Sequence, residues 1–357
     1  MKNINASWKI TITCNPSLKK KTISCLFIWI GLAWLFPNVC VFGQAGQEDI
    51  YIPPIKANTT LEFPAAVPTH DNVRELIEFS RSTQISYEKD VEYINREDNP
   101  LHLQVIRARD MNNRKMPALV FVPGSAWKKQ NVYASIPKLS AFAERGFTVF
   151  IVEYRATDIP PYHPFPAQVQ DVKTAIRFIR KNSERFDIDP DQLFLWGTSS
   201  GGHTAVMVGV TEDKEDLDTD DYSDYSSKVN AIVNYFGPTD IAKMNAVPST
   251  MDHVSPESPE GLLIGGKNVM GHPELVKASN PITYLDEAKS IPPLLIMHGN
   301  RDRLVPFNQS ELLADAMKDL GKEYTFYMLK DADHGSYEFW TEGTLDIVEA
   351  FLRSHFK

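Results

Sequence analysis

Cysteine is nearly absent from this sequence of 357 residues. The three cysteines that occur, Cys14, Cys25 and Cys40, all lie within the first 45 residues. The remaining chain therefore contains no thiol, which excludes disulfide bonds, a cysteine nucleophile and metal sites built from thiolates. It also contains no nucleotide-binding motif and no metal-binding motif, so we expect neither a cofactor nor a bound metal.

Basic residues are outnumbered by acidic ones. The chain has 37 Lys and Arg against 46 Asp and Glu, a net charge of −9. Five of the lysines lie in residues 1–45, which contain no acidic residue, so the chain after residue 45 has 32 basic and 46 acidic residues and a net charge of −14. Such a chain is not expected to bind nucleic acid, because phosphate backbones attract basic surfaces. No feature of the sequence indicates an oligomeric state.

Long hydrophobic runs are also scarce, and the one that stands out lies near the start. Three consecutive lysines precede the apolar segment 23–36, and small residues follow at Gly43 and Ala45. This order of basic, apolar and small residues predicts a secretory signal over 1–45 and an exported protein, either periplasmic or secreted. The apolar segment has 14 residues. About 20 are needed to span a bilayer, so a membrane helix is the weaker alternative.

Two further features concern this leader and the segment that follows it. Cys40 is an alternative site of lipid attachment, although Val39 before it is bulkier than such processing usually accepts. Residues 46–84 begin with many prolines and small residues and predict a linker or N-terminal arm. The folded domain is expected over 85–357.

Eight later segments have the composition of β-strands. Two of them, 85–94 and 101–108, alternate apolar and polar residues, as the half-buried strands of an antiparallel hairpin do. The others are mostly continuous apolar runs, which are typical of parallel strands covered on both faces. They span 118–124, 147–155, 193–197, 229–237, 292–299 and 323–330.

Helical segments, in which apolar residues recur at a period of 3.6, alternate with these strands. They span 136–145, 167–185, 200–210, 308–321 and 343–353. The alternation from residue 118 onward predicts an α/β fold with a mostly parallel eight-stranded sheet and helices on both faces. The segment 238–290 is longer than a simple crossover, and we expect it to form a small cap of substrate-binding loops at the carboxyl ends of the strands.

The sequence Gly-Thr-Ser-Ser-Gly at 197–201 follows a strand and begins a helix. It matches G-x-S-x-G, a sharp turn in which small neighbours let the central serine project above the sheet as a nucleophile. In this register Ser199 is the nucleophile, and Ser200 contributes the backbone N–H that faces a developing oxyanion. The alternative is a glycine-rich turn without chemistry.

An acid and a histidine follow at two later strand ends. Asp302 lies in one of these loops and His334 in the next. The carboxyl ends of parallel strands meet at one edge of a sheet, so a triad of Ser199, His334 and Asp302 can form there. Asp331 and Asp333 are rival partners for His334, but a carboxylate so close in sequence seldom reaches the far ring nitrogen.

Together these residues resemble the α/β-hydrolase superfamily and, within it, the BD-FAE-like carbohydrate esterases, which act on feruloyl and acetyl-xylan esters. The resemblance covers roughly 85–357 and rests on the segments PALVFVPGSAW, VEYR, DIDPDQLFLWGTSSGGH, YFGPTD, LLIMHGNRDRLVPFNQS and DADHG. It implies an α/β-hydrolase fold in which Ser199 is the nucleophile and His334 the general base and acid. Asp302 then orients His334 and stabilises its charged form.

The loop that follows the strand 118–124 departs from the family pattern. Where the family has His-Gly-Gly-Gly-Trp, this chain has Pro-Gly-Ser-Ala-Trp at 123–127. The resemblance assigns the second oxyanion donor to this loop, and alignment places the donor N–H on Ser125 or Ala126. A backbone donor does not depend on its side chain, but the loss of two glycines and the histidine changes what holds the loop in place.

Several nearby polar residues have structural interpretations. His203, one turn into the helix after Ser199, is expected to be a packed histidine, and His298 is expected to order the loop that carries Asp302. Residues 153–155, Glu-Tyr-Arg at a strand end, are expected to form a buried structural ion pair.

The acidic segment 212–224 contains Asp216, Asp218 and Asp220 in a D-x-D-x-D pattern. It lacks the glycine of a calcium-binding loop and also the glutamate at position twelve, where Ser227 lies. We therefore expect a solvated loop rather than a calcium site.

Trp127 and Tyr162 are the aromatic side chains that we expect to contact a sugar ring or an aryl acyl group. The features together predict an exported serine carboxylesterase that acts through a Ser-His-Asp triad. Its substrate is expected to be acylated carbohydrate, with acetyl or feruloyl groups of plant-wall xylan implied by the resemblance. The alternatives are a serine peptidase of the prolyl-oligopeptidase type, a small-molecule acyl esterase or lipase, and an inactive binding protein on the same fold.

Overall fold

The structure is a computed structural model that describes residues 65–67, 83–96, 99–110, 114–288 and 290–357. The predicted signal 1–45, with Cys40, and most of the predicted linker 46–84 lie outside the described residues and stay predictions. The sheet and the helices belong to the unit 77–357. Among the described residues, no helix combines the length and the hydropathy that crossing a bilayer requires.

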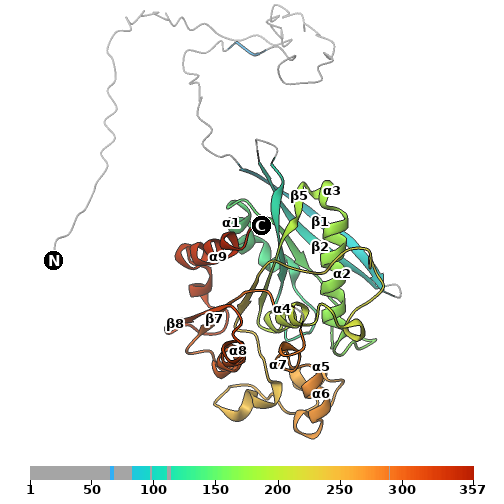
Figure 1. Ribbon diagram of the computed structural model, residues 1–357, viewed down its shortest axis with the longest axis vertical. Helices are drawn as coiled ribbons and strands as arrows, with labels where there is room; N and C mark the ends of the chain where they lie inside the picture. The colour runs from blue at the N-terminus through green and yellow to red at the C-terminus, as the bar shows by residue number, and fades with distance from the viewer. Residues whose placement is uncertain (1–64, 68–82, 97–98, 111–113, 289) are drawn as a thin grey trace, which may run out of the picture. The chain divides into compact units, whose positions relative to one another are not determined.

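One sheet of eight strands forms the centre of the described part of the chain (Figure 1). The strands are β1 (Thr83–Arg96), β2 (Asn99–Asp110), β3 (Met116–Val122), β4 (Thr148–Val152), β5 (Ile188–Thr198), β6 (Ile232–Tyr235), β7 (Leu294–Gly299) and β8 (Tyr324–Leu329). Their order across the sheet is β1-β2-β4-β3-β5-β6-β7-β8. β2 runs antiparallel to both of its neighbours, β1 and β4. From β4 onward in this order, each strand pairs in parallel with the next. The predicted α/β-hydrolase fold is confirmed.

Helices cover both faces of the sheet, as the continuous apolar strands require (Figure 1). On one face lie α1 (Ile136–Ala143) and α9 (Glu342–Ser354). On the other face lie α2 (Ala167–Lys181), α4 (Ser200–Val210) and α8 (Asn308–Asp319). The helix expected over 167–185 is in fact two helices, because Asn182 has φ −102° and ψ 23° and separates α2 from the short α3 (Ser183–Phe186).

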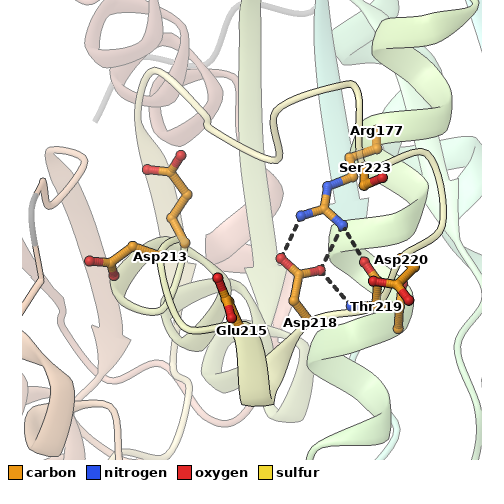
Figure 2. A pocket seen from close by; sticks show the side chains of 8 residues that line it. Arg177, Asp213, Glu215, Asp218, Thr219, Asp220 and Ser223 are labelled. Atoms are coloured by element: carbon orange, nitrogen blue, oxygen red, sulfur yellow. Dashed lines mark hydrogen bonds and ion pairs between the residues drawn. The ribbon is translucent and has the colours of Figure 1, made fainter.

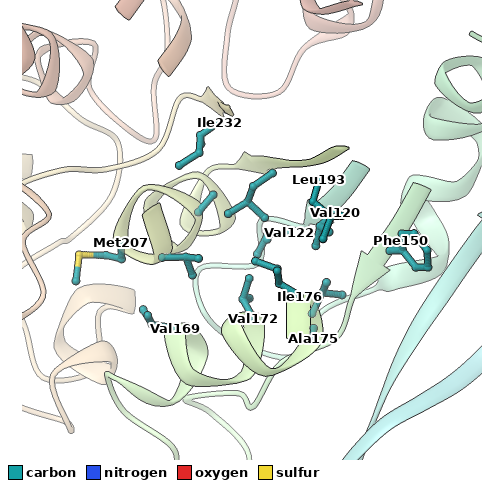
Figure 3. Packing of buried hydrophobic residues seen from close by; sticks show 14 of the residues in the cluster. Val120, Val122, Phe150, Val169, Val172, Ala175, Ile176, Leu193, Met207 and Ile232 are labelled. Atoms are coloured by element: carbon teal, nitrogen blue, oxygen red, sulfur yellow. The ribbon is translucent and has the colours of Figure 1, made fainter. Parts of the chain in front are cut away.

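The core between α2 and the sheet shows why apolar residues that recur every 3.6 positions predict a helix packed on a sheet (Figure 3). Val169, Val172 and Ile176 recur on one side of α2, and each is at most 1% exposed. They belong to one cluster with Val122 of β3 and Leu193 of β5. Burial of each such side chain stabilises the fold by about 1.5–3 kcal/mol. This packing holds α2 against the strands whose carboxyl ends carry the candidate site.

The segment between β6 and β7, called the cap below, folds into short helices, and its role in binding substrate stays a prediction. Its short helices are η3 (Ile241–Ala246), α5 (Pro259–Leu263), η4 (Val269–Gly271), α6 (Pro273–Ala278) and α7 (Ile282–Leu285). A separate hydrophobic cluster joins the cap to one residue of the loop after β3. Its members are Trp127, Ile241, Leu263, Ile264, Val269 and Val276. Trp127 therefore fixes the position of the cap relative to that loop.

Candidate active site

The turn between β5 and α4 is the point around which the site is built. Ser199 occupies it with φ 53° and ψ −128°, a conformation that a residue with a Cβ rarely adopts. The backbone segments approach closely: a Cβ on Gly197 would lie 2.1 Å from the carbonyl oxygen of Gly201. A Cβ on Gly201 would lie 2.1 Å from the carbonyl oxygen of Val122. Only glycine fits at these two positions, so the small residues of the motif have a steric cause.

The structure brings together the serine, the histidine and the acid that the strand ends predicted. His334 Nε2 lies 3.0 Å from Ser199 Oγ, and His334 Nδ1 lies 2.7 Å from Asp302 Oδ2. Asp302 follows β7 and His334 follows β8, and these neighbouring parallel strands end at the same edge of the sheet as β5. The hydroxyl of Ser199 can therefore pass its proton to a histidine whose other nitrogen is held by a carboxylate.

The carboxylate of Asp302 is fully buried, and both of its oxygens have partners. The backbone N–H groups of Leu304 and Val305 each donate to Oδ1 at 2.9 Å. His298, also fully buried, lies 3.3 Å from Oδ2 through Nε2 and so orders this loop, as predicted. Burial acts to raise the pKa of Asp302, but hydrogen bonds with His298 and His334 outweigh it and hold the pKa below its ordinary value. Asp302 is therefore an anion that can stabilise a protonated His334.

The two rival acids bind arginines instead. Asp331 accepts a hydrogen bond from Arg301 Nε at 2.7 Å, and Asp333 accepts one from Arg303 Nε at 2.7 Å. The hydrogen bond with Arg303 is the main cause that lowers the pKa of Asp333 to about 2. Each carboxylate already has a cationic partner, so neither competes with Asp302.

Of the two candidates for the second oxyanion donor, Ser125 and Ala126, the structure leaves one. The N–H of Ser125 donates to the hydroxyl of Ser200 at 2.9 Å, so Ser125 is excluded as a donor to the substrate. Ala126, next in the chain, lines the cavities on both sides of Ser199. Ser200 is the first residue of α4, where backbone N–H groups have no acceptor within the helix. The roles of the N–H groups of Ala126 and Ser200 as oxyanion donors stay predictions.

The loop that carries Ala126 adopts a conformation that glycine normally supplies. Ala126 and Trp127 have φ of 57° and 55°, in the left-handed region. Each such residue costs on the order of 1–2 kcal/mol. Other contacts must therefore hold the loop.

Two hydroxyl groups supply those contacts. Ser200 Oγ accepts the N–H of Ser125, and the hydroxyl of Tyr154 lies 3.0 Å from both Ser125 Oγ and the carbonyl oxygen of Pro123. Burial raises the pKa of Tyr154 to about 12, so the phenol keeps its proton for these hydrogen bonds. Sequence position alone does not reveal this network, because Ser125, Tyr154 and Ser200 are far apart along the chain. The hydroxyl of Ser200 thus has a role of its own besides that expected of its backbone.

His203 is a packed histidine, as predicted, and it links the loop after β3 to the cap. It is 1% exposed. Trp127 Nε1 donates to His203 Nδ1 at 3.2 Å, and His203 Nε2 donates to the carbonyl oxygen of Ser279 at 2.7 Å. Burial lowers the pKa of His203 to about 4, so the ring is neutral at pH 7 and Nδ1 is free to accept.

Two cavities meet at Ser199. A smaller one of about 80 Å³ lies between the turn and the cap, and a larger one of about 420 Å³ lies toward α1. Ser199, Ala126, Leu304 and His334 line both cavities. The two groups of an ester bound at Ser199 can therefore extend in two directions from the reacting carbonyl.

The two predicted aromatic contacts differ in their positions. Trp127 is buried yet lines the smaller cavity together with Ser199 and His334, and its contact with substrate stays a prediction. Tyr162 is 66% exposed and is not among the residues that line either cavity at Ser199. The structure does not bring Tyr162 to the site.

The acidic segment 212–224 lines a different cavity, of about 580 Å³ (Figure 2). Arg177 of α2 reaches into it and binds both carboxylate oxygens of Asp218, with Nη1 2.7 Å from Oδ1. Within the expected solvated loop, Asp218 is an exception, because Arg177 of a helix distant in sequence pairs with it and largely buries it. Across the described residues, no group of three or more His, Cys, Asp or Glu side chains is arranged to hold a metal ion.

Glu153 and Arg155 do not pair with each other. Each forms a structural pair with residues elsewhere in the fold. Arg155 Nε lies 2.9 Å from the fully buried carboxylate of Asp171 on α2. Glu153 pairs with His102 of β2 at 3.2 Å and with Lys129. These contacts join the end of β4 to its neighbours and leave Glu153 and Arg155 outside the triad.

Comparison with known proteins identifies what this chain is similar to. The BD-FAE family profile matches residues 105–317. The esterase LipC of Mycobacterium tuberculosis is 28% identical, over 67% of this chain and 58% of LipC. A truncated carbohydrate esterase from gut microbiota, a solved structure, is 28% identical with a TM-score of 0.66, over 78% of this chain and 98% of its own. The bifunctional GH43-CE of Bacteroides eggerthii is 29% identical with a TM-score of 0.66, over 78% of this chain and 39% of its own. The chain spans about half the length of the curated relatives it matches.

Ser200→Ala should slow the reaction of Ser199 with a fluorophosphonate by about tenfold, less than the ~10²–10³ that complete loss of one oxyanion donor costs. The variant keeps the backbone N–H of residue 200 but leaves the N–H of Ser125 without its acceptor, so the donor at Ala126 shifts. Mass spectrometry of the intact protein measures the labelling rate, and Ser226→Ala at an exposed serine is the control. Equal rates for the two variants would exclude a role for the Ser200 hydroxyl.

The free energy of unfolding should fall as the pH drops from about 6.5 to 4, and His203→Gln should remove about 3 kcal/mol of this fall. In the unfolded chain histidine binds a proton near pH 6.5, whereas the buried ring resists protonation until about pH 4. The contribution of neutral His203 to the free energy of unfolding is therefore fully present above the pKa of histidine in the unfolded chain, and it is lost as the pH falls toward 4. Urea unfolding at pH 7 and pH 4 measures the difference, and His272→Gln, at a more exposed histidine, is the control. If the free energy of unfolding of His203→Gln falls between pH 7 and pH 4 by as much as that of the wild type, this prediction is wrong.

Proposed function

The chain belongs to the BD-FAE family, and on that premise we propose that it is a serine carboxylesterase. The observation that carries the proposal is the position of His334, within hydrogen-bonding distance of both Ser199 and Asp302. A serine hydroxyl is a weak nucleophile, and a histidine that accepts its proton activates it. The similarity to LipC and to a carbohydrate esterase supports ester hydrolysis as the reaction.

The reaction begins when Ser199 Oγ attacks the carbonyl carbon of the ester and the hydroxyl proton moves to His334 Nε2. Asp302 stabilises the resulting imidazolium through Nδ1. The carbonyl oxygen becomes an oxyanion that accepts hydrogen bonds from the backbone N–H groups of Ser200 and Ala126. His334 then gives its proton to the leaving alcohol oxygen, and an acyl group remains on Ser199.

Water completes the cycle. His334 takes a proton from a water molecule, the hydroxide attacks the acyl carbon, and the same N–H groups stabilise the second oxyanion. The bond to Ser199 Oγ breaks, the serine recovers its proton from His334, and the free acid leaves.

The proposed substrate is acylated carbohydrate, with acetyl or feruloyl groups on plant-wall xylan. The carbohydrate esterase that aligns over 78% of this chain supports this class. Cavities of about 80 and 420 Å³ on the two sides of Ser199 are consistent with a small group of the ester on one side and a larger group on the other. The leader 1–45 supports export, since such polymers occur outside the cell.

Ser199→Ala should lower the hydrolysis of p-nitrophenyl acetate by about 10⁴-fold or more, because it removes the nucleophile. The absorbance of released p-nitrophenol measures the rate, and Ser226→Ala is the matched control. A folded wild-type protein that neither hydrolyses this ester nor reacts with a fluorophosphonate would overturn the proposal in favour of an inactive binding protein.

The substrate class is tested with the wild-type protein on acetylated xylan and on feruloylated arabinoxylan. We expect release of acetate or ferulate, identified by chromatography. Hydrolysis of p-nitrophenyl acetate without release of acid from either polymer would reject the carbohydrate substrate and favour a small-molecule esterase. Cleavage of a proline-containing peptide in place of these esters would favour the peptidase alternative.

A further inference from the structure

The cap contributes two buried titratable side chains that the proposed mechanism does not use. His253 and Glu260 are each 3% exposed, and both line the smaller cavity together with Ser199 and His334. Most of the other lining residues there, such as Met251, are apolar. Ionisable groups are costly to bury in such surroundings unless their hydrogen bonds are made.

His253 of this pair is hydrogen-bonded to the loop after β7, which carries Asp302. His253 Nε2 lies 3.0 Å from the carbonyl oxygen of Leu304 and 3.0 Å from the hydroxyl of Ser249. A carbonyl only accepts, so Nε2 carries a hydrogen, and Nδ1 faces Glu260, whose Oε1 lies 3.0 Å away. The N–H of Leu304 donates to Asp302, so the pair is tied to the loop that holds the triad acid.

The other side of the pair is left without partners. Within the described part of the chain, Glu260 Oε2 and His253 Nδ1 make no hydrogen bond, because the short contact between Nδ1 and Oε1 is not aligned as one. Buried polar atoms in native proteins nearly always have a partner. A purely structural ion pair would use both carboxylate oxygens, whereas this pair leaves one buried carboxylate oxygen without a partner, on a residue that lines the cavity at Ser199.

We propose that Glu260, positioned by His253, accepts a hydrogen bond from a hydroxyl group of the substrate and thereby selects hydroxylated esters. This inference rests on the proposed esterase function and makes its substrate class more specific. A hydroxyl fits better than a cation, because Glu260 is the only carboxylate among the described residues that line this mostly apolar cavity. The hydroxyl belongs either to the alcohol, as in a sugar, or to the acyl group, as in a hydroxycinnamate.

Two pairs of esters distinguish these sources. Methyl 4-hydroxycinnamate and methyl cinnamate differ by a hydroxyl on the acyl group, and glycerol monoacetate and propyl acetate differ by hydroxyls on the alcohol. Within each pair, the ratio of kcat/KM values is measured for the wild type, Glu260→Gln and Glu260→Leu. We expect the wild type to favour the hydroxylated member of one pair by about 10- to 100-fold and Glu260→Leu to bring that ratio close to one. Glu260→Gln, which hydrogen-bonds without charge, should give an intermediate ratio.

The matched control is Glu274→Gln in another His–Glu pair of the cap, where His272 Nδ1 lies 3.2 Å from an exposed Glu274 carboxylate. Its ratios should equal those of the wild type. Partial unfolding lowers both rates of a pair equally, so the ratio responds to recognition rather than to stability. Equal rates within both pairs for the wild type, or a preference that survives in Glu260→Leu, would overturn this inference while the esterase proposal stands. A wild type inactive on all four esters and on p-nitrophenyl acetate would overturn the proposed function itself.

Discussion

The close approach of three backbone segments at Ser199 is the constraint on which the site depends. β5 ends beside β3 and α4 begins at once, so a side chain at Gly197 or Gly201 would collide with a carbonyl oxygen. This crowding holds Ser199 in a backbone conformation that costs on the order of 1–3 kcal/mol. The packing of α2 and α4 on the sheet offsets that cost. In return, the serine hydroxyl meets His334, which arrives from the end of β8.

The loop after β3 also has an unfavourable backbone conformation, which side-chain hydrogen bonds hold in place. Ala126 and Trp127 take left-handed conformations without the help of glycine. The hydroxyls of Ser200 and Tyr154 hold the loop from one side, and the hydrogen bond from Trp127 to His203 holds it from the other. Because Trp127 also belongs to the hydrophobic cluster of the cap, the loop, helix α4 and the cap form one connected unit. Side-chain hydrogen bonds thus hold a backbone geometry that glycine would adopt without strain.

Most of the fold was predictable because it depends on local patterns. A strand buried on both faces must be apolar throughout, and a helix on a sheet repeats its apolar residues every 3.6 positions. Element ends were less predictable: β6 covers only Ile232–Tyr235 of the expected strand 229–237, because hydrogen bonds to neighbouring strands decide where a strand ends. The pairing of Asp218 with Arg177 was not predictable, because nothing in an acidic segment indicates which cation will face it.

By itself, the sequence determined the alternation of strands and helices, and it determined which serine, aspartate and histidine follow the strands. Chain order alone carries that information, because parallel strands end at a common edge. Only the tertiary structure decided that Asp302 rather than Asp333 binds the imidazole ring of His334, and that the N–H of Ser125 is occupied. It also placed Glu260 of the cap in the cavity of Ser199. These outcomes depend on distances of a few ångströms between segments far apart in the chain, which the packing of the whole domain sets and no local pattern encodes.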